Sequence, residues 1–170
     1  NSEVGHMNIG AGRIVFQDLT RISRDIKNGG FFEKKVFNDA ISEGKLSGSN
    51  VHIFTLLSDA GVHSHDTHMR AFLKMLKSLD IKNVFIHAFM DGRDTSPTSG
   101  IDYMKKTIEM CSEIGTGRIA TLMGRFYAMD RDKRWERTKR AYDALVFGEG
   151  SFDSDPLHAI SDSYKAEKTD

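Results

Sequence analysis

Short apolar segments alternate with longer amphipathic segments from residue 51 onward, and this alternation limits the possible folds more than any other feature. Each short segment is rich in β-branched and other apolar residues and is bounded by Gly, Ser, Asn or Asp, as buried strands are. The three expected strands are Val51–Leu57, Asn83–Met90 and Arg118–Met123. Parallel strands joined through helices are the repeating unit of α/β proteins. The sequence therefore predicts a βαβαβα fold, with a parallel-type sheet flanked by helices.

The segments that follow these strands carry apolar residues at three- and four-residue spacing, which is the spacing of an amphipathic helix. The first such stripe is Met69, Phe72, Leu73, Leu76 and Leu79, with Ser64 or Asp66 available as the N-cap. The second stripe is Ile101, Met104, Ile108 and Cys111, and the third contains Trp135, Tyr142, Leu145 and Val146. The first fifty residues are less regular, and there we expect only a helix near Glu33 to Ser42.

Composition narrows the class of protein further. The chain has 170 residues, 39% of them hydrophobic, which suffices for one domain with its own core. Lys and Arg balance Asp and Glu at 24 each, so net charge favours neither a nucleic-acid partner nor a membrane surface. The single cysteine, Cys111, forms no internal disulfide and suits a reducing compartment. We expect a cytoplasmic protein without a membrane span.

Chemically reactive side chains are concentrated directly after each expected strand. These loops read SDAGVHSHDTH, DGRDTSP and GRFYAMDRDKR. In open α/β sheets, ligands bind at the carboxyl ends of the strands. Neighbouring strands would bring His63, Arg93, Asp94, Arg125 and Arg131 into one cleft. Guanidinium groups match carboxylate and phosphate oxygens, so the pattern predicts a small anionic ligand beside an acid–base pair of His63 and Asp94.

Each loop also has an alternative interpretation. His63, His65 and His68 could ligate a metal together with Asp59 and Asp66, or could only cap a helix. An Asp of DGRDT could accept backbone N–H groups in a turn. The arginines near residue 130 could form a solvated ion-pair network with Asp130 and Asp132.

Four motifs, NSEVGHMNIGAGR, SDAGVHSH, DGRDTSP and GRFYAMDRDKRW, occur in this order and at separations that resemble the cofactor-independent phosphoglycerate mutases. That family belongs to the alkaline phosphatase superfamily. The resemblance implies interconversion of 3- and 2-phosphoglycerate through a phosphoserine intermediate, in an enzyme with two metal ions, normally manganese.

The resemblance also implies roles for individual residues. Ser2 matches the serine that accepts the phosphoryl group and touches a metal ion. Asp94 would move protons on and off the glycerate hydroxyls with His63 close by, and Arg93, Arg125 and Arg131 would bind the substrate. The resemblance further implies that the enzyme is monomeric and that phosphoglycerate is its only partner.

Most of the family's metal ligands have no counterpart in this chain, which indicates a piece of the enzyme that is inactive alone. Residues 1–16 would be the nucleophile-bearing segment of the phosphatase domain. Residues 17–170 would be the inserted phosphotransferase domain, incomplete at its C-terminus. We expect the opening segment to be a loosely packed working loop. A free-standing domain that binds phosphoglycerate or glycerate without catalysis is the alternative, and a sugar-phosphate mutase is a weaker one.

Overall fold

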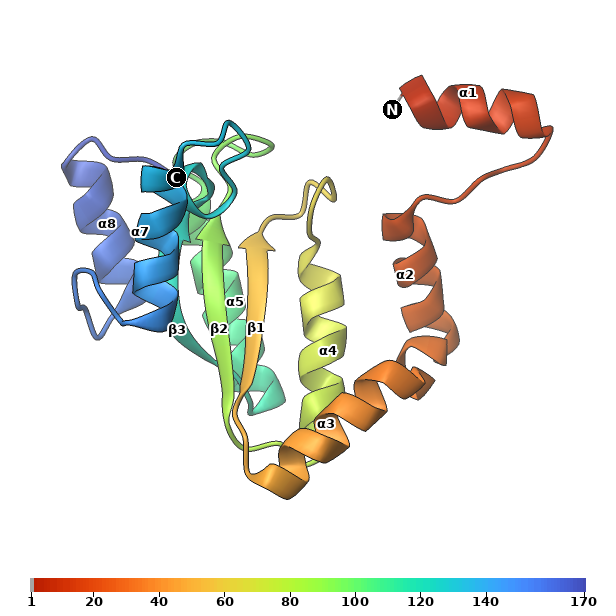
Figure 1. Cartoon of the computed structure of the whole chain (residues 1–170), viewed down its shortest axis with the longest axis horizontal. Coiled ribbons are helices and arrows are strands. Elements are labelled where there is room, and N and C mark those ends of the chain that lie inside the picture. The colour runs from red at the N-terminus through yellow and green to blue at the C-terminus, as the bar shows by residue number, and fades with distance from the viewer. Residues whose placement is uncertain (1) are drawn as a thin grey trace.

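A three-stranded parallel sheet forms the centre of the protein (Figure 1). The computed structural model describes residues 2–170 apart from the side chain of Ser2. The strands lie in the order β1 (Val51–Leu57), β2 (Val84–Met90) and β3 (Arg118–Gly124). Each expected strand is found to within one residue at either end, so the α/β class and the parallel pairing are confirmed.

The two crossover helices pack on one face of the sheet and form the core with it. These are α4 (Asp66–Ser78) and α5 (Gly100–Ile114). Leu73 and Leu76 of α4 and Met104 of α5 are fully buried, as the apolar stripes predict. They meet the inward side chains of β2, among them Ile86. Burial of such side chains contributes about 2 kcal/mol each, so this face provides much of the stability.

The start of α4 differs from the prediction. The N-cap is His65, whose Nδ1 accepts the backbone N–H of Thr67 at 3.3 Å. Neither Ser64 nor Asp66 takes this position, because α4 begins at Asp66 and the Ser64 hydroxyl lies 3.1 Å from the Thr55 hydroxyl of β1. Ser64 therefore ties the loop back to the sheet.

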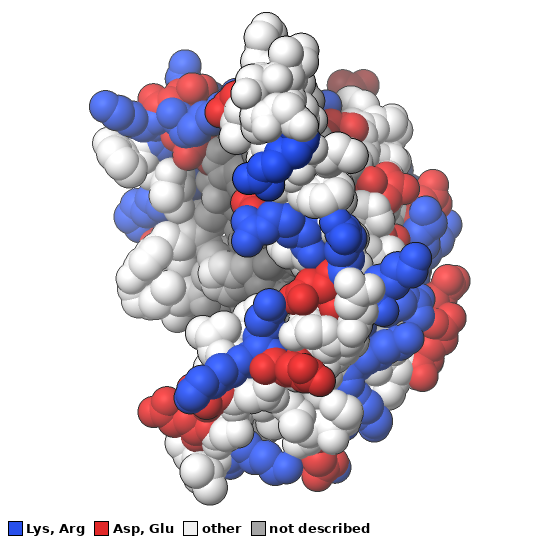
Figure 2. Space-filling model, turned by 90° about the vertical axis from the view of Figure 1, so that its right-hand side faces the viewer, with Lys and Arg blue, Asp and Glu red and all other residues white. Residues whose placement is uncertain are grey.

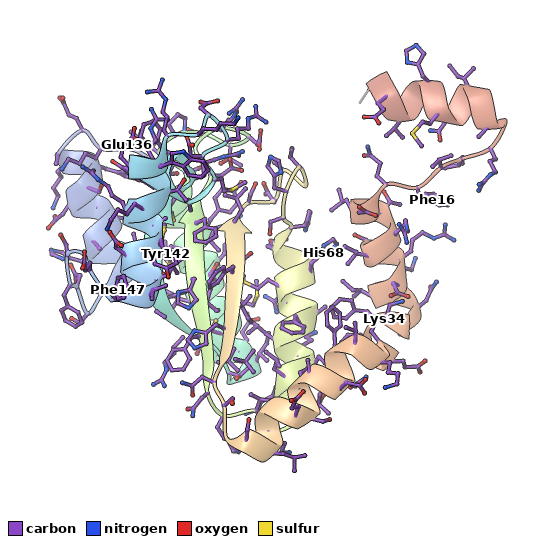
Figure 3. The ribbon with its side chains drawn as sticks, viewed as in Figure 1. Phe16, Lys34, His68, Glu136, Tyr142 and Phe147 are labelled. Carbon is purple, nitrogen blue, oxygen red and sulfur yellow. The ribbon has the colours of Figure 1, made fainter. Side chains whose placement is uncertain are left out.

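The third predicted helix exists, but its apolar stripe does not face the core. It is α7 (Trp135–Val146), which follows the short helix α6 (Arg125–Ala128) and lies against β3. Its buried residues are Ala141 and Asp143, whereas Trp135 is 70% exposed. Tyr142 lies edge-on to Phe147 with ring centroids 6.0 Å apart (Figure 3). The helix therefore buries one small and one charged side chain, and Trp135, Tyr142 and Val146 of the predicted stripe are left exposed.

One further helix, α8 (Pro156–Lys165), was not predicted. It begins with Asp155 as N-cap, whose carboxylate accepts the N–H of Leu157 at 2.8 Å, and it has proline in its first turn. Ile160 is buried, and α8 packs against α5. A cap followed by proline is a recognised helix start, so the signal was present in the sequence.

The N-terminal part contains more helix than predicted. It comprises α2 (Asp18–Asn28), the 3-10 helix η1 (Gly30–Glu33) and α3 (Lys35–Ser47). The expected helix near Glu33 to Ser42 corresponds to α3, which starts two residues later and runs further. A chain of aromatic contacts through Phe31, Phe37 and Phe72 attaches these elements to α4.

The opening segment is a helix, α1 (Ser2–Ala11), rather than the predicted loop. It is separated from α2 by residues 12–17 and lies apart from the sheet in Figure 1. Its described side chains are mostly exposed, Ile9 at 83%, in agreement with the expected loose packing. From the α1 and α2 side, Figure 2 shows basic and acidic side chains intermingled, in keeping with the zero net charge.

Candidate active site

The loops that follow the three strands meet at one edge of the sheet, as predicted for carboxyl ends of parallel strands. In Figure 1 this is the upper edge, where the C-terminus also lies. The β1 loop contributes His63, the β2 loop contributes Asp91 and Asp94, and α6 begins with Arg125 directly after β3. Chain segments more than thirty residues apart are thereby brought into contact.

Arg125 is the centre of this cluster. Its Nη1 atom donates to Oδ1 of Asp91 and to Oδ2 of Asp94, both at 2.7 Å. The Arg125 side chain is only 12% exposed, and those of Asp91 and Asp94 are 1% and 22% exposed. Burial would lower the pKa of the guanidinium, but the two carboxylates outweigh it and raise the pKa. Arg125 is therefore a fixed cation shared by two carboxylates.

Asp91 is the important residue that sequence reasoning missed. Its Oδ1 accepts the backbone N–H groups of Arg93, at 3.2 Å, and Asp94, at 3.0 Å, so it closes the turn that presents Asp94. Burial would raise the pKa of the Asp91 carboxyl, but the hydrogen bonds from the Asp94 N–H, the Ser58 hydroxyl and Arg125 outweigh it and lower the pKa. The structural Asp considered for DGRDT is thus Asp91, which leaves the Asp94 carboxylate for other contacts.

His63 faces the same carboxylate. Its Nε2 lies 3.9 Å from Oδ2 of Asp94, and its side chain is 41% exposed. The structure thus brings His63, Asp94 and Arg125 together, as the sequence predicts. A partly exposed imidazole beside a partly exposed carboxylate can exchange protons with a bound hydroxyl group.

Arg93 and Arg131 lie at this edge without joining the cluster. Both residues are exposed, and within residues 2–170 neither guanidinium forms a hydrogen bond or ion pair. Arg93 is fixed only through its backbone N–H on Asp91. Two exposed cations beside an acid–base pair suit an anionic ligand that approaches from solvent.

The ion-pair network considered near residue 130 has a different composition from the one predicted. The side chain of Asp130 is 2% exposed, and its Oδ1 lies 3.5 Å from Nη1 of Arg137. Its Oδ2 accepts the backbone N–H groups of Asp132 and Arg134 at 3.2 and 2.9 Å. Asp130 therefore holds the loop that carries Arg131 and does not neutralise that arginine.

The other two histidines of GVHSHDTH, His65 and His68, are used structurally. His65 caps α4, and Nε2 of His68 lies 2.9 Å from the Ser23 hydroxyl of α2; Figure 3 shows His68 on the side of α4 that faces α2. Burial, followed by the charge of His65, lowers the pKa of His68. No group of three or more His, Cys, Asp or Glu that could hold a metal ion occurs within the described residues. The metal-site interpretation of His63, His65 and His68 is wrong, because their side chains are directed to different partners.

Comparison with known proteins shows the family of the chain. The family described as BPG-independent PGAM N-terminus matches residues 22–170. The chain belongs to this family. Over all 170 residues it is 53% identical to the 2,3-bisphosphoglycerate-independent phosphoglycerate mutase of Clostridium beijerinckii and 52% identical to that of Acetivibrio thermocellus. It covers 33% of each, so the chain spans about a third of the length of these curated relatives.

A solved structure shows the same fold. Crystal structures of Leishmania mexicana phosphoglycerate mutase at low cobalt concentration superimpose with a TM-score of 0.87 at 28% sequence identity. The superposition covers 98% of this chain and 32% of that one.

The two manganese ions expected from the resemblance do not fit the residues of this family member that the structure describes, since no suitable ligand cluster is present among them. The side chain of Ser2, the expected nucleophile and metal contact, lies outside the described residues. The described helices are each too short or too polar to cross a bilayer.

Proposed function

We propose that this chain supplies the substrate-binding part of an enzyme that interconverts 3- and 2-phosphoglycerate. The observation that carries the proposal is the cluster of Arg125, Asp94 and His63 at the carboxyl ends of the strands. Relatives 53% and 52% identical, named as phosphoglycerate mutases, support the substrate class. The substrate carries a carboxylate, a phosphate and a hydroxyl group, which match the cations and the acid–base pair of this edge.

In the proposed reaction the deprotonated Ser2 oxygen attacks the phosphorus atom, and the bond between phosphorus and the substrate oxygen breaks. That oxygen takes a proton from protonated Asp94 and becomes a hydroxyl group. The glycerate then turns, and its other hydroxyl group attacks the phosphorus atom of the phosphoserine while its proton passes to the Asp94 carboxylate. The bond between phosphorus and the Ser2 oxygen breaks, which restores the deprotonated Ser2 oxygen and the protonated Asp94. Two displacements at phosphorus thus replace one intramolecular transfer.

The remaining residues retain the intermediate in this scheme. His63 lies within reach of the same hydroxyl groups as Asp94. Arg93, Arg125 and Arg131 bind the carboxylate and phosphate oxygens, so that glycerate is not lost to water while it turns. Arg125 is already fixed by two carboxylates, whereas Arg93 and Arg131 close on the ligand from the exposed side.

The division of the chain is part of the proposal. Residues 1–16, which include α1, would supply the nucleophile, and residues 17–170 would bind the substrate. The two manganese ions would be bound by residues other than those described. The isolated chain is then expected to bind phosphoglycerate without converting it. Cytoplasmic location and a monomeric state stay predictions from the sequence.

Calorimetric titration of the chain with 3-phosphoglycerate tests the binding part of the proposal. Arg125→Gln should weaken binding about 10- to 100-fold, the value of one or two charge-assisted hydrogen bonds. Arg118→Gln is the matched control. Arg118 is the first residue of β3, whereas Arg125 directly follows the last residue of that strand, so the two arginines lie at opposite ends of it. The Arg118 guanidinium lies over Phe85, 4.3 Å from the ring centroid. Equal losses in both variants, or no binding by the unmodified chain, would contradict the assignment.

Mutase activity of the protein at its natural length tests the chemistry. Loss of activity in Ser2→Ala, with 3-phosphoglycerate binding retained, is the expected result. Binding without turnover at natural length would instead favour the non-catalytic binding domain considered above.

A further inference from the structure

We propose that Asp91 is a positioning residue that takes up part of the charge of Arg125 and thereby keeps Asp94 able to accept and return protons. This inference rests on the proposed function of Asp94. It concerns a residue that lies behind the cleft, with its side chain only 1% exposed, and that does not itself reach the substrate.

The geometry shows one cation shared by two carboxylates. The same nitrogen of Arg125 lies 2.7 Å from an oxygen of Asp91 and 2.7 Å from an oxygen of Asp94. The three groups together carry one negative charge. Without Asp91, the guanidinium would pair with Asp94 alone, and that pair would be neutral.

A carboxylate paired one-to-one with a buried guanidinium binds protons weakly, because protonation would leave the cation unpaired. Asp94 would then be a poor base. The nearby negative charge of Asp91 offsets this effect and restores proton affinity to Asp94. The two oxygens lie within about 5 Å of each other, a separation at which two unit charges interact by roughly one to two pKa units at an effective dielectric constant of about 20–40.

The charge of Asp91 is directed at Arg125 rather than shared among many cations. Its Oδ1 accepts two backbone N–H groups and the guanidinium, and the further hydrogen bond to its carboxylate comes from the Ser58 hydroxyl, which is neutral. The charge of Asp91 also acts on Tyr103 and Asp170, neither of which supplies a positive charge.

The other groups around Asp94 are few. His63 approaches it from the β1 loop at 3.9 Å, and Arg125 from α6 at 2.7 Å. Arg93 precedes it in the same loop and is exposed. Among these groups and Asp91, only Asp91 adds negative charge. Removing the charge of Asp91 should therefore lower the proton affinity of Asp94.

The test is the pH profile of kcat for the protein at its natural length, with 3-phosphoglycerate as substrate. Asp91→Asn keeps the size and the acceptor oxygen but removes the charge. The basic limb of the profile should move to lower pH by about one to two units, and kcat near neutral pH should fall about threefold to tenfold, because less of Asp94 then carries the proton that the first step requires. KM should change less than kcat. Asp102→Asn, on an exposed position of α5, is the matched control and should leave the profile unchanged.

A lower kcat with an unmoved basic limb would overturn the inference, since a residue that only supports the turn does not change the proton affinity of Asp94. If Asp91→Asn does not fold, Arg125→Gln replaces it. Removing the cation while Asp91 stays should move the limb at least about one unit to higher pH, and an unmoved limb would again overturn the inference. Absence of mutase activity in the unmodified protein would refute the proposed function and this inference with it. Normal activity with an unchanged Asp91→Asn profile would refute the inference alone.

Discussion

Removing the carboxylate of Asp130 is expected to destabilise the protein and to loosen the loop that carries Arg131. The Asp130 side chain is 2% exposed and accepts the backbone N–H groups of Asp132 and Arg134. It also lies 3.5 Å from Nη1 of Arg137. Asp130→Ala therefore removes an ion pair and two backbone hydrogen bonds at one step.

The size of the expected loss in stability depends on the contacts that Arg137 keeps when the Asp130 carboxylate is removed. Removing one member of a buried ion pair costs about 3–5 kcal/mol. Arg137 is 22% exposed, and its guanidinium lies 3.7 Å from the ring centroid of Phe126, so the cation keeps water and an aromatic contact. We therefore expect Asp130→Ala to lower the free energy of unfolding by about 2–4 kcal/mol.

Urea unfolding followed by circular dichroism measures this change. Asp132→Ala is the matched control, because Asp132 is exposed and its backbone N–H still binds Asp130 in that variant. The control should stay within about 0.5 kcal/mol of the unmodified chain. Equal losses in the two variants, or a loss below about 1 kcal/mol for Asp130→Ala, would refute this account of the loop. Calorimetry with 3-phosphoglycerate should also show weaker binding by Asp130→Ala than by the control.

Three further expectations concern stability and reactivity. Gly117→Ala should lower the melting temperature more than Gly29→Ala, although both glycines have positive φ. An added Cβ at Gly117 would lie 3.1 Å from Cys111 Sγ, whereas an added Cβ at Gly29 would meet no atom within 4 Å. Equal losses in the two variants would contradict this. The hydrogen bond to Asp153 raises the pKa of His158, so its stabilisation is complete below about pH 6.5 and disappears as pH rises through the raised value. The difference in melting temperature between the unmodified chain and His158→Gln should therefore be larger near pH 5.5 than near pH 9, and a constant difference would argue against it. Burial raises the pKa of the Cys111 thiol, so iodoacetamide should label it at the rate of unfolding, and rapid labelling of the folded chain would contradict its burial.

Much of the fold could be predicted because local pattern and burial agree along the central part of the chain. Val84, Ile86 and Ala88 are buried in a strand whose apolar run is evident in the sequence. The helical stripe of α4 places Leu73 and Leu76 in the core at the expected spacing. The stripe of α7 misled because large apolar side chains indicate a buried face only when another element covers them. In α7 the buried residues are the small Ala141 and Asp143 instead.

The sequence by itself determined the three strands, the helices α4, α5 and α7, the parallel sheet, and the edge at which His63, Asp94 and Arg125 would lie, because apolar period and strand direction are local properties. Only the tertiary structure decided which carboxylate closes the turn and which one faces His63. Asp91 and Asp94 are three residues apart in one loop, yet one is buried against two backbone N–H groups and the other is partly exposed beside His63. Hydrogen bonds and burial that depend on Arg125, more than thirty residues away, assign these positions, and no local pattern contains that information.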